Sequence, residues 1–207
     1  MLEILGRSTS INVRKVLWTC AELGLPYRHS EWGTGELSLR APAFLALNPN
    51  ALVPVIRDGD FVLWESNTIC RYLAARAGRT DLLPAQPAGR ARVEQWMDWQ
   101  ATELNTAWRA AFMGRVRKSP AFADPDLIDA SVQAWNRHMT LLDELLRGTG
   151  AFVTGSGFTL ADVVLGLATH RWFMTPMERP DLPAVTAYYD RLDTRPGFRA
   201  HGRNGIP

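Results

Sequence analysis

Cysteine is scarce in this sequence, which holds only Cys20 and Cys70 and no CxxC pair. Both residues fall in stretches with the apolar spacing of a helix, where a buried, reduced thiol is the ordinary interpretation. The four histidines are isolated, and there is no Cys/His cluster with zinc spacing, no phosphate-binding loop, no GxGxxG and no HExxH. We therefore expect no metal site and no redox role for the protein's own thiols.

Long hydrophobic runs are also missing, since no segment reaches the roughly 18 apolar residues that a membrane-spanning helix needs. The amino terminus has neither the basic region nor the apolar stretch of a secretory signal. The net charge is only +2 and the basic residues are scattered, whereas a nucleic-acid-binding protein would carry a denser basic face. These absences predict a cytoplasmic protein without a membrane or nucleic-acid partner.

The first 78 residues alternate short apolar strands with amphipathic helices. A hydrophobic fraction of 46% and a charged fraction of 21% are typical of a globular chain. Two of the apolar runs bracket an Asp-Gly turn and predict an antiparallel hairpin. The expected strands are 2–5, 27–32, 52–56 and 61–64, and the expected helices begin at residues 12 and 65. This order, β-α-β followed by β-β-α, matches a thioredoxin-like unit.

The remainder of the chain shows only helical periodicity. Residues 79–89 hold two prolines and a glycine with little periodicity, so we expect an inter-domain linker there. Apolar residues spaced by three and four then predict a long helix through 93–112 and a second from about 125 to 147. Further helices are expected from about Thr159 and after Pro183. The predicted domains are therefore 1–78 and an all-helical 90–207.

Four short motifs stand out along the chain. They read SIN at residues 10–12, NPNALVP at 48–54, WESN at 64–67 and GFTLAD at 157–162. In this order and spacing they resemble the cytosolic glutathione transferases, and the opening Ser-x-Asn motif is similar to that of bacterial members. The resemblance extends over almost the whole chain, from the first strand to the Arg195-Pro196 tail.

This resemblance implies the glutathione transferase fold, with an α/β thioredoxin-like N-terminal domain (βαβ-ββα) and an all-α helical C-terminal domain. It implies glutathione as co-substrate, its transfer to a small electrophile in detoxification, and a two-fold homodimer in which the N-terminal domain of one subunit faces the helices of the other. Two alternatives stay open: glutathione-dependent reduction of a disulfide or peroxide, and a non-enzymatic binding module on the same fold.

Glu65 and Ser66 are candidates for the γ-glutamyl end of glutathione. Ser66 stands where a helix begins, so its hydroxyl and the first free N–H groups can bind a carboxylate. Glu65 can pair with the ammonium group. From the residues alone, a plain N-cap at Ser66 and an acid favoured by the helix dipole at Glu65 explain the pattern as well.

The pair Val53-Pro54 has a similar double interpretation, because proline beside a strand usually marks an edge or a turn. The resemblance implies a cis bond here, with the backbone of Val53 pairing with the cysteinyl part of glutathione like an added strand. Many relatives place Lys or Gln before this pair, whereas this chain has Leu52, which offers only its backbone. The glycyl carboxylate then needs another ligand, for which Arg40 is a candidate.

Four residues near the first helix are candidates to activate the glutathione thiol: Ser8, Thr9, Ser10 and Asn12. A thiol with a pKa of about 8.5 is only ~3% thiolate at pH 7, and lowering that pKa to about 6.5 raises the thiolate fraction roughly 25-fold. A hydroxyl hydrogen bond and a helix N-terminus can supply the ~2.7 kcal/mol required. The resemblance implies that Ser10 donates this bond, with Asn12 second and Thr9 third. The alternative is that Ser10 only caps the helix.

The electrophile is expected between the first loop and the long helix after the linker. Trp108 and Phe112 are candidates to line that pocket, although aromatic residues at helical spacing are as often core. A basic cluster near the end of this helix either attracts an acidic co-substrate or is an ordinary solvated face. Its members are Arg109, Arg115, Arg117 and Lys118. Thr159 and Asp162 are interpreted as a capping box, a structural role.

Overall fold

The computed structural model describes residues 1–207, and its first part is built on a four-stranded mixed sheet in the order β2-β1-β3-β4. The strands are β1 Leu2–Leu5, β2 Tyr27–Ser30, β3 Val55–Asp58 and β4 Phe61–Trp64. Strand β1 runs parallel to β2 and antiparallel to β3, and β3 pairs antiparallel with β4. This topology confirms the predicted thioredoxin-like unit.

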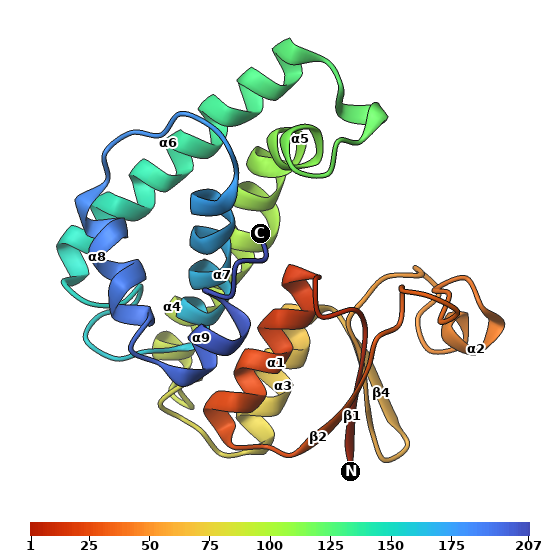
Figure 1. Cartoon of the computed structure of the whole chain (residues 1–207). Helices are drawn as coiled ribbons and strands as arrows, with labels where there is room; N and C mark the ends of the chain where they lie inside the picture. Colours follow the sequence, from red (N-terminus) through yellow and green to blue (C-terminus); the bar gives the residue numbers. More distant parts are fainter.

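Helices cover the two faces of the sheet differently. Figure 1 shows α1 (Ile11–Leu23) and α3 (Ser66–Arg76) lying between the sheet and the C-terminal helices. The short α2 (Pro42–Leu45) lies away from those helices and seals the other face through Phe44, which packs with Leu5 and Val55. This arrangement aims the first turns of α1 and α3 toward the second half of the molecule.

Two predicted strands have different bounds in the structure, since 52–56 is shifted to Val55–Asp58 and 27–32 is shortened to Tyr27–Ser30. The run 52–56 forms a strand only from Val55, because Pro54 has no N–H to donate and Ala51 takes a positive φ of 54° that breaks the extended path. The second strand ends at Ser30 rather than residue 32, because the N–H of Trp32 turns back to the Ser30 carbonyl at 2.9 Å.

The second half contains only helices. They are α4 Pro87–Trp99, the π-helical η1 Gln100–Leu104, α5 Asn105–Arg115, the 3-10 turn η2 Pro120–Phe122, α6 Pro125–Thr149, α7 Leu160–Met174, α8 Pro183–Leu192 and α9 Pro196–His201. The predicted helix 93–112 is therefore longer and includes a wide π turn, and its first turn falls within the segment expected as the linker. Helix α9 is not anticipated, because six residues are too few for a periodic signal.

Helix α7 forms the centre of the helical part, since 13 of its 15 residues are buried. Its start confirms the predicted capping box. The Asp162 carboxylate accepts the backbone N–H of Thr159 at 2.8 Å and also that of Val153 at 2.9 Å. A buried acid thus joins the helix to the preceding loop.

The two halves share one hydrophobic core, a continuous cluster of 40 buried residues. Trp18 of α1 lies at its junction, with its ring centroid 4.9 Å from that of Phe198 in α9 and 5.7 Å from that of Phe158. Gly197 leaves room for this ring, because a Cβ there would lie 2.5 Å from Trp18 Cδ1. The shared core fixes one half against the other.

Cys20 and Cys70 are buried and unpaired, as the apolar spacing predicts. Burial raises the pKa of the Cys20 thiol to about 12 and that of Cys70 to about 11. No helix in the chain is long and apolar enough to cross a membrane.

Candidate functional site

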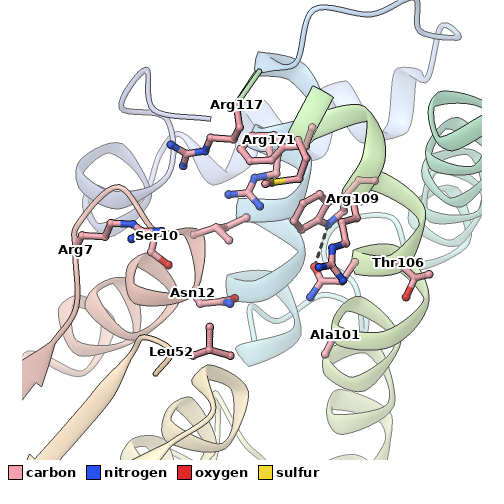
Figure 2. A pocket seen from close by; sticks show the side chains of 14 residues that line it. Arg7, Ser10, Asn12, Leu52, Ala101, Thr106, Arg109, Arg117 and Arg171 are labelled. Atoms are coloured by element: carbon pink, nitrogen blue, oxygen red, sulfur yellow. Dashed lines mark hydrogen bonds between the residues drawn. The ribbon is translucent and has the colours of Figure 1, made fainter. Parts of the chain in front are cut away.

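Three cavities meet at Asn12, in the first turn of α1. The largest, of about 540 Å³, lies between the start of α1 and helices α5 and α7, as Figure 2 shows. A second, of about 230 Å³, runs along Glu65 and Ser66 at the start of α3. A third, of about 50 Å³, lies beside Val53 and Pro54. Because Asn12 lines all three, one ligand can extend from the start of α3 past the start of α1 into the large cavity.

Ser10 is the N-cap of α1, yet its hydroxyl makes no capping hydrogen bond. Its carbonyl accepts the N–H of Arg14 at 3.0 Å, so the first N–H groups of the helix have no helical partner. Ser10 lines the large cavity. Ser8 and Thr9 line none of the three cavities. The N–H of Ser8 is bound to the Glu31 carboxylate at 2.9 Å.

Ser66 opens α3 and is only 6% exposed, and its hydroxyl has no hydrogen-bond partner within the chain. It lines both smaller cavities. Glu65, one residue earlier, is exposed and has a positive φ of 73°. A bulky residue in that conformation is strained, and such strain is concentrated at functional sites. The start of α3 thus presents a hydroxyl and a carboxylate to the cavities.

The peptide bond between Val53 and Pro54 is cis. The backbone N–H and C=O of Val53 make no hydrogen bond with the chain, although the residue lies next to the sheet. Leu52 is 62% exposed and its carbonyl accepts the side chain of Asn48 at 2.8 Å. Arg40 is exposed and lines none of the three cavities.

Trp108 and Phe112 both line the large cavity from α5. They also pack edge to face with their ring centroids 5.4 Å apart, and Phe112 is only 3% exposed. The indole N–H of Trp108 donates to Asn105 Oδ1 at 2.9 Å. Both roles that the sequence leaves open for these two residues therefore apply: their rings pack against each other as core and also form part of the cavity wall.

Comparison with known proteins identifies the family. Residues 9–76 match the model of the glutathione S-transferase N-terminal domain, and residues 125–191 match that of the C-terminal domain. A curated relative, glutathione S-transferase GstB of Escherichia coli K12, is 40% identical over 202 residues, 96% of each chain. The chain belongs to the glutathione S-transferase family.

A solved structure and a second curated relative agree with this assignment. The theta class glutathione S-transferase from Xanthomonas axonopodis pv. citri, with glutathione bound, is 39% identical, with a TM-score of 0.90 over 97% of this chain and 96% of that one. Glutathione S-transferase 3 of Zea mays is 30% identical over 96% of this chain and 91% of its own length. The protein is therefore a glutathione transferase that uses glutathione as co-substrate.

The transferase also holds a buried lysine that sequence reasoning missed. Lys15 is 1% exposed and donates to Asn67 Oδ1 at 3.1 Å and to Gln100 Oε1 at 2.6 Å. Burial lowers the pKa of Lys15 to about 8. The π turn η1 brings Gln100 to this network, which joins α1 and α3 to the helical half at the cavity beside Ser66. The signal available in the sequence was a charged residue, Lys15, among the apolar residues of the first helix.

Four arginines of the transferase line the large cavity: Arg7, Arg109, Arg117 and Arg171. Figure 2 shows that they come from the loop before α1, from α5 and the residues after it, and from α7. Two of them, Arg109 and Arg117, belong to the basic cluster identified in the sequence. Sequence reasoning missed Arg7, and it missed Arg171, although an arginine inside the otherwise apolar segment 160–174 is a usable signal.

Proposed function

We propose that this transferase binds glutathione across the three cavities that meet at Asn12 and transfers its thiolate to a small electrophile in the largest. The observation that supports this proposal is the position of Asn12, which borders a polar cavity, a backbone edge and a cavity lined by aromatic side chains. These are the surroundings that a charged γ-glutamyl group, a peptide unit and an electrophile require, in that order.

The γ-glutamyl group binds at the start of α3 in this proposal. The free hydroxyl of Ser66 and the first N–H groups of the helix bind its carboxylate, where the helix dipole favours negative charge. Glu65 binds the ammonium group from the rim. The absence of an internal partner for the Ser66 hydroxyl supports this role over a simple capping role.

The cysteinyl unit pairs with the backbone of Val53. Its N–H and C=O are unpaired in the chain, so an extended peptide can add to them as a further strand would. Pro54 and the exposed Leu52 border this contact. The glycyl end then lies on the Leu52 side.

The thiol lies at the start of α1, where Ser10 donates a hydrogen bond to the thiolate and Asn12 is a second donor. The hydroxyl of Ser10 is free because it caps nothing, and this supports Ser10 over Thr9. Serine acts here as a donor and not as a nucleophile. Trp108 and Phe112 form the wall against which the electrophile lies.

We further place this enzyme with the bacterial members that open with Ser-x-Asn, as a two-fold homodimer that serves detoxification in the cytoplasm. The two free thiols support a reducing compartment. The identity between this chain and GstB supports the bacterial grouping.

The first measurement is the pKa of the bound thiol, from thiolate absorbance against pH in the wild type and in Ser10→Ala, Asn12→Ala and Thr9→Val. Binding of glutathione is measured in parallel by calorimetry. The wild type lowers the thiol pKa well below that of free glutathione, and Ser10→Ala raises it by about 1 to 2 units, because a charge-assisted hydrogen bond is lost. Thr9→Val serves as the matched control and leaves it unchanged.

Other outcomes reassign or remove the role. A raised pKa of the bound thiol in Asn12→Ala, with an unchanged thiol pKa in Ser10→Ala, assigns thiol activation to Asn12. No binding of glutathione at all would overturn the proposed site.

A further inference from the structure

The large cavity is strongly cationic. Its walls include Arg7, Arg109, Arg117 and Arg171, and no aspartate or glutamate lines it. None of the four arginines forms a salt bridge anywhere in the molecule. Elsewhere in the chain many arginines are paired with acids, for example Arg195 with Glu22 at 2.5 Å. The charge in this cavity is therefore left without a protein counter-ion.

Arg171 is the decisive member of this group. It is only 3% exposed, and its guanidinium donates no hydrogen bond to the protein. Its Nε is fully enclosed without a partner, whereas its two Nη atoms are not enclosed and the residue lines the cavity. Because a buried, unpaired charge is costly, an arginine whose four Nη donors are unused and face a cavity is suited to a negatively charged ligand.

Aromatic rings hold this guanidinium in place. Its Cζ lies 4.0 Å from the ring centroid of Phe112 and 4.6 Å from that of Trp108. These are the two residues proposed to line the electrophile site. Burial, together with the charges of Arg14 and Arg117, holds the pKa of Arg171 well below its usual value, so the surroundings lack negative charge.

Arg14 shows the contrast within the same cluster. It is as buried as Arg171, yet it donates to the carbonyls of Ile206 and Pro207 at 2.6 and 3.0 Å. The C-terminal segment therefore accepts hydrogen bonds from both terminal nitrogens of Arg14, although its Nε has no partner. Arg171 and Arg117 have no such acceptors and line the cavity.

We propose that the electrophile carries a carboxylate, which Arg171 binds with Arg117 while the reacting carbon faces Ser10. This inference rests on the proposed transfer function and names its substrate class. The planar guanidinium, held close to two aromatic rings, presents paired N–H groups that match the two oxygens of a carboxylate.

The carboxylates of glutathione itself are placed elsewhere. In Figure 2, Arg117 and Arg171 lie on one side of Asn12 and Leu52 lies on the other. The proposed glycyl end is on the Leu52 side, and the γ-glutamyl end is at Ser66, which does not line the large cavity. The two arginines therefore flank the space left for the second substrate.

The test uses an aryl chloride with chlorine between two nitro groups, as the benzoate and as the neutral benzamide. In both, the glutathione sulfur bonds to the ring carbon and chloride leaves with the bonding electron pair, so no oxidant or reductant is needed. With saturating glutathione, Arg171→Met lowers kcat/KM for the benzoate roughly 10- to 100-fold and that for the benzamide by less than about 3-fold. Arg117→Met gives a smaller loss of the same kind, because this residue is exposed.

Two controls distinguish the loss of the positive charge in the cavity from a general effect on folding. Arg137→Met removes an exposed arginine on α6 that lines none of these cavities and leaves both rates unchanged. Calorimetry with unreactive dinitrobenzoate measures anion binding without any transfer, and Arg171→Met abolishes this binding while the affinity for glutathione stays the same.

Equal losses for benzoate and benzamide, or dinitrobenzoate binding that survives both arginine substitutions, would overturn the proposal. A loss of glutathione affinity in Arg171→Met would overturn it too, since the arginine would then serve the co-substrate. Dinitrobenzoate binding that depends on Arg171, without turnover of either aryl chloride, would support the anion site and reject the transfer function.

Discussion

Ser10 and Ser66 each lie at the start of a helix, and neither hydroxyl group makes a hydrogen bond within the protein. Ser10 is an N-cap without a capping bond, and Ser66 is almost fully buried without an internal partner. Buried hydroxyls normally find a partner within the protein. At the scale of single residues, the proposed site consists of groups that the fold positions and leaves unsatisfied.

Ser66→Ala is expected to weaken glutathione binding about 5- to 20-fold, because one hydrogen bond to a charged group is lost. The free energy of unfolding changes by less than about 0.5 kcal/mol, since no internal hydrogen bond is removed. Calorimetric titration and urea unfolding measure the two effects. Ser156→Ala, on an exposed loop, is the matched control. An unchanged affinity in Ser66→Ala would contradict the γ-glutamyl assignment.

The residue candidates that could be predicted are those in local motifs. Ser10, Asn12 and Ser66 sit at helix starts, where a short run of sequence determines both the backbone and the exposed group. Lys15 and Arg171 were not predicted as site residues, because helices distant in the sequence bring their partners. Periodicity places a residue on its own helix and gives no information on the helix opposite.

At the scale of elements, α7 depends on its first turn. Its sequence has no polar face, so its position rests on burial and on the Asp162 carboxylate, which accepts N–H groups from Thr159 and Val153. The sequence predicts this start well, since Thr-x-x-Asp is a local signal. The π turn η1 could not be predicted in the same way, because the hydrogen-bond partner of its first residue Gln100 is Lys15, which lies far away in the sequence on α1.

Asp162→Ala is expected to lower the free energy of unfolding by about 2 to 4 kcal/mol, because two buried N–H groups lose their acceptor. Urea unfolding measures this change. Asp124→Ala removes the exposed N-cap of α6, whose carboxylate accepts a single N–H at 3.0 Å, and is expected to cost about 1 kcal/mol. Equal effects in the two variants would show that burial of the cap contributes nothing.

The C-terminal segment is fastened to α7 through His170. This buried imidazole contacts the Ile206 carbonyl at 2.9 Å and the Tyr189 hydroxyl at 2.8 Å. Burial first, and then the charge of Arg14, lowers the pKa of His170 to about 4. The folded state therefore favours the neutral ring, so the stability that it contributes is present above about pH 6.5 and is lost as the pH falls toward 4.

Between pH 6.5 and 4, His170 is expected to reduce the free energy of unfolding by about 3 kcal/mol. Asp162 acts in the opposite direction, because burial raises the pKa of its carboxyl to about 6 and protonation favours the folded state there. Comparison of urea unfolding against pH for wild type and His170→Gln isolates the histidine. The free energy of unfolding of the wild type then approaches that of His170→Gln on acidification, and a constant difference between the two would contradict the assignment.

At the scale of the whole molecule, the two halves share one core through Trp18. The sequence predicts each half, because their periodicities differ, and the thioredoxin-like fold is confirmed. It does not predict how they pack together. That contact depends on small residues, Gly166 and Gly197, whose lack of a side chain carries no periodic signal.

Gly197→Ala is expected to lower the free energy of unfolding by about 1 to 3 kcal/mol, because the added methyl would overlap the buried Trp18 ring. Far-ultraviolet circular dichroism and tryptophan fluorescence should give one coincident transition, since both halves unfold together. Gly148→Ala on α6 meets no atom within 4 Å and is expected to be neutral or stabilising. Two separate transitions in the wild type would contradict a shared core.

The two cysteines have a consequence for the lifetime of the catalyst. An enzyme that brings soft electrophiles close to a thiolate exposes its own sulfur atoms to alkylation. Here both thiols are fully buried, and burial holds their pKa values far above neutrality, so they are neither reachable nor ionised. The only thiol that the electrophile meets belongs to the glutathione, and each turnover carries that sulfur away and leaves both protein thiols unmodified.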